Sequence, residues 1–120
     1  MLRERLSEER DKLTMSITAW LVFIMAALLE VGGDALVRRG LRAAGLPFVA
    51  AGFVTLGCYG LVVNSVRWDF SKLIGVYVAF FALVSILVGR VAFHESIPLS
   101  TWLGMGLIIA GGMVIQWGTP

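Results

Sequence analysis

Charged and reactive side chains are scarce in this chain. Only 15% of its 120 residues are charged, 58% are hydrophobic, and the mean hydropathy is +0.87, whereas a soluble domain carries roughly 25% charged residues. The single cysteine, Cys58, has no partner for an intrachain disulfide. The one histidine, His94, stands beside Glu95, which falls short of a metal site, and no catalytic triad is indicated. We therefore expect an all-α membrane protein that is not an enzyme, with no cofactor, metal or nucleic-acid partner.

Long apolar runs take the place of the missing charges. Each run is near the roughly 20 residues that a helix needs to cross a bilayer. Trp20, Trp68, Trp102 and Trp117 fall at or near the ends of these runs, where amphipathic rings prefer the headgroup level. The sequence predicts a multi-pass inner-membrane protein of four transmembrane helices with short loops, at residues 17–37, 46–66, 73–93 and 99–117.

The amino-terminal segment differs from the rest in composition. MLRERLSEERDKLT carries four acids and four bases and lacks the basic start, apolar stretch and cleavage site of a secretory signal. Leu2, Leu6 and Leu13 share one side of a helix, with Glu8 and Lys12 as an i,i+4 pair. We expect an uncleaved extension over residues 1–15, either an amphipathic surface helix or an unstructured tail, and a four-helix transmembrane domain over residues 16–120.

The distribution of basic residues leaves the orientation in the membrane open. The side of the amino terminus carries six bases and the other side four, but without residues 1–15 the counts become two and four. The positive-inside rule therefore gives opposite answers depending on whether the extension is counted. Both a single orientation and insertion in both directions stay open.

Glu30 is the most informative residue, because it lies within the first apolar run. A carboxylate in hydrocarbon costs several kcal/mol, so it indicates an ion, proton or substrate site. Asp34 and Arg38 follow at four-residue steps and share its helix face. The alternatives are a structural Glu30 that is hydrogen-bonded to a neighbouring helix, and an Asp34 that neutralises Arg38.

Aromatic and hydroxyl groups in the second and third runs complete the candidate site. Tyr77, with Phe80 and Phe81 nearby, can offer ring faces to a cation. The hydroxyl of Tyr59 needs a partner if it is buried. Packing is the alternative role for these rings. If a proton and a cation compete for the charge of Glu30, alternating access produces antiport.

Glycines recur along one face of the fourth run. Gly104 and Gly111 are seven residues apart, and Gly106 and Gly112 stand beside them. Such faces allow close packing of helices in lipid. Four helices enclose little volume, so we expect a dimer whose interface includes Gly104, Gly111 and Gly112. Packing of these glycines within one chain is the alternative.

Several of these features together resemble the small multidrug resistance family. They are Glu30 followed by Arg38, the loop FHESIPLS before the last run, and the Gly-x6-Gly spacing in LGMGLIIAGG. The resemblance implies an antiparallel homodimer with one chamber lined by Glu30 of both copies and by Tyr77. It also implies exchange of protons for a cationic compound.

The sequence thus predicts a proton-coupled antiporter in the lipid bilayer. Its substrates would be small organic cations of quaternary ammonium, guanidinium or polyamine type, bound at Glu30, Asp34, Tyr77 and Tyr59. One alternative is a subunit that flips a lipid-linked sugar or another amphiphile. Another is a non-transporting membrane subunit of a larger complex.

Overall fold

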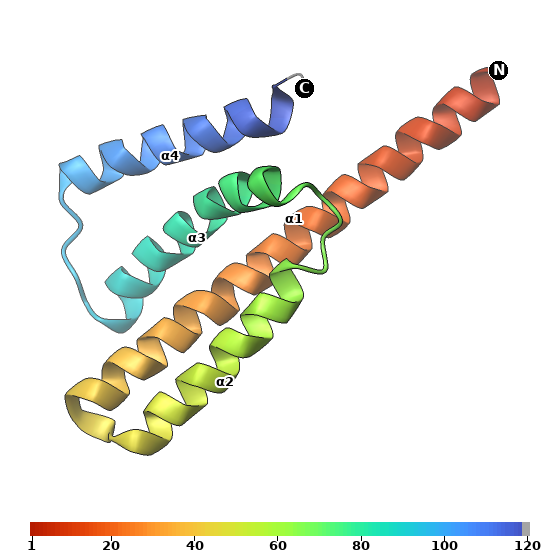
Figure 1. The fold of residues 1–120 in the computed structure, drawn as a ribbon. Coiled ribbons are helices and arrows are strands. Elements are labelled where there is room, and N and C mark those ends of the chain that lie inside the picture. Colours follow the sequence, from red (N-terminus) through yellow and green to blue (C-terminus); the bar gives the residue numbers. More distant parts are fainter. Residues whose placement is uncertain (119–120) are drawn as a thin grey trace.

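The computed structural model describes residues 1–118, apart from the side chain of Met15. In this part of the chain α1 is Leu2–Arg39, α2 is Leu46–Val63, α3 is Phe70–Ala92 and α4 is Leu99–Trp117 (Figure 1). Each of the four helices is long and apolar enough to cross a membrane. The prediction of an all-α membrane protein with four candidate spans is confirmed.

The helix ends agree with the predicted runs to within a few residues at most positions. α4 has the predicted bounds. α2 ends three residues early, at Val63. The side-chain amide of Asn64 donates to the carbonyl of Gly60 at 2.8 Å and closes the last turn. α3 begins at Phe70, where the carbonyl of Asp69 accepts from the amide of Leu73 at 2.9 Å.

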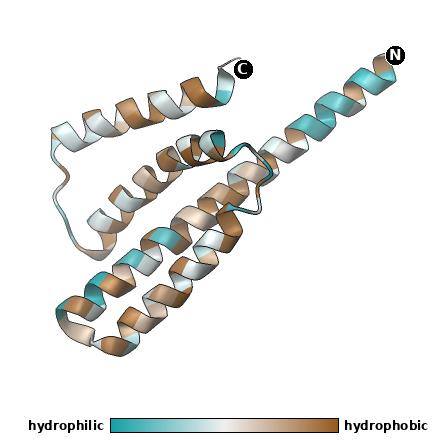
Figure 2. Cartoon of the chain, in the orientation of Figure 1, coloured by the Kyte–Doolittle hydropathy of each residue, from teal (hydrophilic) through white to brown (hydrophobic). Residues whose placement is uncertain are grey.

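The first helix is much longer than its predicted span. α1 has 38 residues, and at 1.5 Å per residue it extends about 57 Å, nearly twice the roughly 30 Å of a hydrocarbon core. Its amino-terminal part projects beyond the other helices, and the hydrophilic bands there mark the charged extension (Figures 1 and 2). The extension is therefore helical and continuous with the first span, with no break at residue 15. Its status as a separate unit stays a prediction.

The helices pack in the order α2, α1, α3, α4, and within residues 1–118 α4 contacts α3 alone among the helices. α1 and α2 approach closely because Gly33 faces Gly52. A short π-helical turn, η1 (Gly40–Ala44), and Gly45 at φ 82° connect them. Glycine suits this φ because it has no Cβ.

The main core lies where α1 and α3 meet, between α2 and α4 (Figure 1). Phe23, Ala26 and Ala27 of α1 are fully buried against α3 residues that include Tyr77. The two alanines allow the helices to approach one another, and the large rings fill the space that remains. This core holds the side chains of the candidate site.

Candidate functional site

A hydrogen bond between Tyr77 and Glu30 lies at the centre of the candidate site. The Tyr77 hydroxyl of α3 donates to Oε2 of Glu30 in α1, with 2.6 Å between the two oxygens. Tyr77 is 3% exposed and Glu30 is half-buried. The acid therefore has a fixed donor on the neighbouring helix, 47 residues away in the sequence.

Tyr59 of α2 faces the same carboxylate. It lies near both Glu30 and Tyr77, and its ring centroid is 5.5 Å from that of Tyr77. The Tyr77 ring also contacts Phe23 at 5.9 Å and Phe81 at 6.5 Å, measured between centroids. Glu30 is thus beside a set of aromatic rings contributed by three helices. Ring faces attract cations electrostatically, so a carboxylate with such neighbours suits an organic cation.

A crevice of about 240 Å³ between α1 and α3 opens one helix turn from this carboxylate. Asp34 and Arg38 line it from α1, and Phe81 and Ser85 line it from α3. At its outer end the Arg38 guanidinium lies 5.5 Å from the centroid of the Phe93 ring. The crevice therefore leads from the end of the bundle with the α1–α2 turn towards Glu30.

Gly89 and Glu95 shape the mouth of this crevice. The loop after α3 turns at His94, which has φ 53°, and the Glu95 amide donates to the carbonyl of Gly89 at 3.0 Å. The Glu95 carboxylate then lies where a side chain at position 89 would stand. The mouth is consequently acidic as well as basic, with Asp34, Glu95 and Arg38 around it.

Aromatic packing closes the opposite end of the site. Phe23 is fully buried, and Trp68 of the α2–α3 loop packs edge-to-face on it with ring centroids 5.3 Å apart. The Lys72 ammonium lies 4.5 Å from the centroid of the Trp68 ring. Val63 is 1% exposed and belongs to the same cluster. Glu30 is therefore separated by packed rings from the end of the bundle with the α2–α3 loop.

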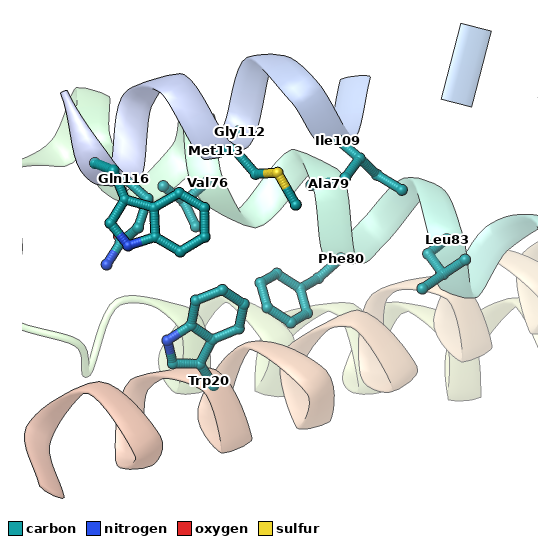
Figure 3. Close-up of a pocket in the computed structure, with 10 residues that line it drawn as sticks. Trp20, Val76, Ala79, Phe80, Leu83, Ile109, Gly112, Met113 and Gln116 are labelled. Atoms are coloured by element: carbon teal, nitrogen blue, oxygen red, sulfur yellow. The ribbon is translucent and has the colours of Figure 1, made fainter. Parts of the chain in front are cut away.

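A separate apolar cavity of about 180 Å³ lies on another face of α3, against α1 and α4. Figure 3 shows Trp20 and Phe80 on one side of it and Met113 and Gln116 on the other. Among the residues that the structure describes, those that line it carry no charge. Gln116 Oε1 is buried without a hydrogen-bond partner in the described part of the chain. This cavity does not suit a charged ligand, so the candidate site remains the one at Glu30.

Three of the predicted site residues meet in the structure, namely Glu30, Tyr77 and Tyr59. Asp34 is exposed in the neighbouring crevice, and its direct role in binding stays a prediction. The alternative of a purely structural Glu30 also stays open, because Tyr77 supplies the hydrogen bond that such an acid would need.

The predicted glycine face of the fourth helix divides in two. A Cβ at Gly112 would lie 3.2 Å from the Ala79 Cβ, so Gly112 packs against α3 within one chain and not on a free face. Gly104 and Gly111 have open space where a side chain would be. Gly112 is therefore a contact within one chain, which corrects its predicted place in the dimer interface. Gly104 and Gly111 as contacts of a dimer stay a prediction.

Sequence reasoning names Phe81 beside Tyr77 but does not group these rings with Ser85 as the outer part of the site. Phe81 and Ser85 follow Tyr77 at four-residue steps, so helical periodicity alone places all three on one face of α3. The sequence predicts Trp68 only as a ring at the headgroup level, whereas in the structure it also packs on Phe23. Glu95 reaches the crevice through a loop conformation at His94, for which the sequence gives no signal.

Related sequences give the family of the chain. A UPF0060 membrane protein of Mycolicibacterium vanbaalenii is 40% identical over 80 residues, which cover 65% of this chain and 74% of the relative. A UPF0060 membrane protein of Nocardia farcinica is 34% identical over 80% of this chain and 88% of the relative. One from Saccharopolyspora erythraea is 32% identical over 80% and 89%. No family model and no solved structure matches the chain.

These relatives overturn the resemblance to the small multidrug resistance family. That resemblance was wrong because it depended on general features: four spans, an acid in the first span and a glycine spacing in the last. The names of the relatives give another family, UPF0060, and describe them as membrane proteins. The chain belongs to the UPF0060 membrane protein family.

Proposed function

We propose that this protein exchanges protons for small organic cations across the membrane, with Glu30 as the shared binding group. The observation that carries the proposal is the 2.6 Å hydrogen bond from Tyr77 to Glu30 within the spans. A carboxyl group at this depth costs too much to be retained in contact with lipid. The two tyrosines give it polar neighbours inside the bundle.

The chemistry of the site supports a cation with an apolar body. Tyr77 donates to Oε2, so the carboxyl can still bind a proton or the charged end of a ligand through Oε1. The rings of Tyr59, Tyr77 and Phe81 can contact the alkyl or planar part of the ligand. Quaternary ammonium, guanidinium and polyamine compounds combine these two properties. A proton and such a cation compete for one negative charge.

Alternating access requires the site to open at one end while it is closed at the other. The crevice of Asp34 and Ser85 leads towards one end of the bundle, and the rings of Phe23 and Trp68 block the other. In the proposed cycle the two ends exchange these states. Export follows if the cation enters from the cell interior and the proton enters from outside, in an inner membrane that carries a proton gradient.

A second copy of the chain is proposed to complete the chamber. Within the described residues α4 contacts only α3, and Gly104 and Gly111 leave space for another helix. Close packing of small residues is the main source of helix association in lipid. An antiparallel pair agrees with the counts of basic residues, which favour opposite orientations with and without the extension.

Transport in proteoliposomes tests the proposal directly. Vesicles that contain the purified protein and a pH-sensitive dye receive guanidinium, tetramethylammonium or spermidine on the outside. We expect movement of protons out of the vesicles with the intact chain, and none with Glu30→Gln. Asp69→Asn, in the α2–α3 loop, is the matched control and should keep full activity, because Asp69 is exposed and outside the bundle.

Two results would contradict the proposal. Exchange that persists undiminished in Glu30→Gln vesicles would remove Glu30 from the mechanism. Absence of exchange with every cation, together with purification of a stoichiometric larger partner, would favour a non-transporting subunit.

A further inference from the structure

The charged extension of α1 has three distinct faces. At 100° per residue, Leu2, Leu6 and Leu13 lie within about 40° of one another. The same helix continues without a break into the first span, so these positions have defined directions around its axis. The three leucines are 72%, 54% and 64% exposed, and nothing among the described residues covers them. This leucine face therefore needs a partner outside the chain.

Basic side chains border the leucine face on both sides. Arg3 and Arg10 lie on one flank, and Arg5 and Lys12 lie on the other, each about 50–100° from the leucines. The acids Glu4, Glu8 and Asp11 lie on the opposite side of the helix. Glu9 alone is an acid at the edge of the leucine face. Although the extension has no net charge, its charges are strongly segregated around the helix.

This segregation disfavours a second copy as the partner of the leucine face. Two such helices packed through their leucines would bring the flanking bases of one against those of the other, and like charges that face each other are destabilising. An anionic lipid surface fits instead. The leucines would enter the boundary between headgroups and acyl chains, the bases would contact the headgroup phosphates, and the acids would face water.

The threonines at the base of the extension provide a place for the helix to bend. Thr14 Oγ1 donates to the carbonyl of Arg10, and Thr18 Oγ1 donates to the carbonyl of Thr14, each at 2.9 Å. Such bonds to the i−4 carbonyl compete with the helical ladder and often bend helices. Thr18 lies about 140° and Thr14 about 100° around the helix from the centre of the leucine face. Opening of the ladder on their side bends the helix away from them, in a direction that has a component towards the leucines.

A bend in this direction brings the leucine face closer to the membrane surface. The leucine face continues along α1 as Ile17, at the start of the span, and Ile24, two turns further in, which are 54% and 44% exposed. These isoleucines face outward from the bundle, towards lipid. A bend on that side therefore lowers the leucines onto the bilayer surface next to the span. Because the span already holds the extension there, docking is intramolecular and needs little additional affinity.

We infer that residues 2–14 form a docking helix for anionic lipid, which bends at Thr14 and Thr18 to lay its leucine face on the membrane surface. Docking is expected for a copy whose amino terminus lies on the side with the leaflet richer in anionic lipid, whichever way its partner is inserted. This role is independent of Glu30 and of the proposed exchange.

Spin labels on opposite faces of the helix test this inference in the full chain. Leu6→Cys and Glu4→Cys are made in a Cys58→Ser background, labelled with a nitroxide, and reconstituted in phosphatidylglycerol or phosphatidylcholine vesicles. In phosphatidylglycerol we expect the label at position 6 to collide with oxygen dissolved in lipid and the label at position 4 to collide with a water-soluble nickel chelate. In phosphatidylcholine both labels should meet the chelate.

The flanking bases provide a second measurement. Arg3→Gln combined with Arg10→Gln should lower the equilibrium constant for docking about 25-fold, since each base near an anionic surface contributes roughly fivefold. Arg67→Gln, in the α2–α3 loop, is the matched control and should leave the label at position 6 in lipid. Equal exposure of both labels to water in phosphatidylglycerol would overturn the inference. Spin–spin broadening at position 6 would also overturn it, because that signal would identify a second copy on the leucine face.

Discussion

Gly33 of α1 and Gly52 of α2 bring the backbones of their helices into direct contact. A Cβ added at Gly52 would lie 2.8 Å from the carbonyl oxygen of Gly33 and 2.5 Å from the Val37 side chain. Since neither the carbonyl nor the backbone of α1 can move without displacing the helix, this contact fixes the separation of α1 and α2. It thereby sets the distance of Tyr59 from Glu30.

Gly52→Ala is therefore expected to destabilise the fold by about 1–3 kcal/mol, the usual cost of overpacking a core. Reversible unfolding in mixed micelles, followed by circular dichroism, measures the change. Gly57→Ala is the matched control, because a Cβ there meets no atom within 4 Å and alanine favours the helix. If both variants unfold at the same detergent fraction, α1 and α2 do not pack through these glycines.

Tyr77→Phe keeps the ring of the site and removes only its hydroxyl. Hydrogen bonds to charged groups contribute about 1.5–3 kcal/mol, so we expect cation binding to weaken between ten- and a hundredfold. Calorimetric titration in two buffers of different ionisation enthalpy gives both the affinity and the number of protons released. Tyr59→Phe should weaken binding less. An unchanged affinity in Tyr77→Phe would show that the hydroxyl only supports the fold.

Trp68→Ala should open the closed end of the site. Loss of its ring from Phe23 leaves a gap beside the core, and for a half-buried tryptophan we expect a cost of about 2 kcal/mol. Water can then reach Glu30 from both ends, which we expect to produce an uncoupled proton leak in proteoliposomes. Trp102→Ala, on the outside of α4, should cause no leak. If Trp68→Ala vesicles show no proton leak, another part of the protein closes this end of the site.

Gly111→Leu and Gly112→Leu separate contacts between chains from contacts within one chain. Gly112 meets Ala79 of α3, so leucine there should detach α4 and lower the thermal stability of a single chain. Leucine at Gly111 has space within the chain and should reduce only the dimer, as measured by light scattering in detergent. A dimer that survives Gly111→Leu would mean that the copies associate through another face.

Much of the fold follows from the sequence because membrane insertion depends on local composition. Each apolar run is long enough to satisfy its own backbone hydrogen bonds as a helix, so the four spans and most of their ends were predictable. The full length of α1 was not predictable in the same way. Its charged extension has no apolar run, and only the continuous helical backbone joins it to the first span.

The candidate site likewise has one part that the sequence predicts and another that depends on tertiary packing. Glu30 could be identified from sequence alone, because a carboxyl group within an apolar run is costly wherever the neighbouring helices lie. Its contact with Tyr77 depends on how α3 packs against α1, and 47 residues separate the two side chains. The place of Glu95 at the crevice depends on a single loop conformation at His94. The sequence by itself determined which segments are long and apolar enough to cross a bilayer and which acid lies among them, since both follow from the transfer of individual groups into lipid. Only the tertiary structure decided which rings and hydroxyls meet that acid and which end of the bundle is closed, because helix packing and loop geometry depend on contacts between distant residues.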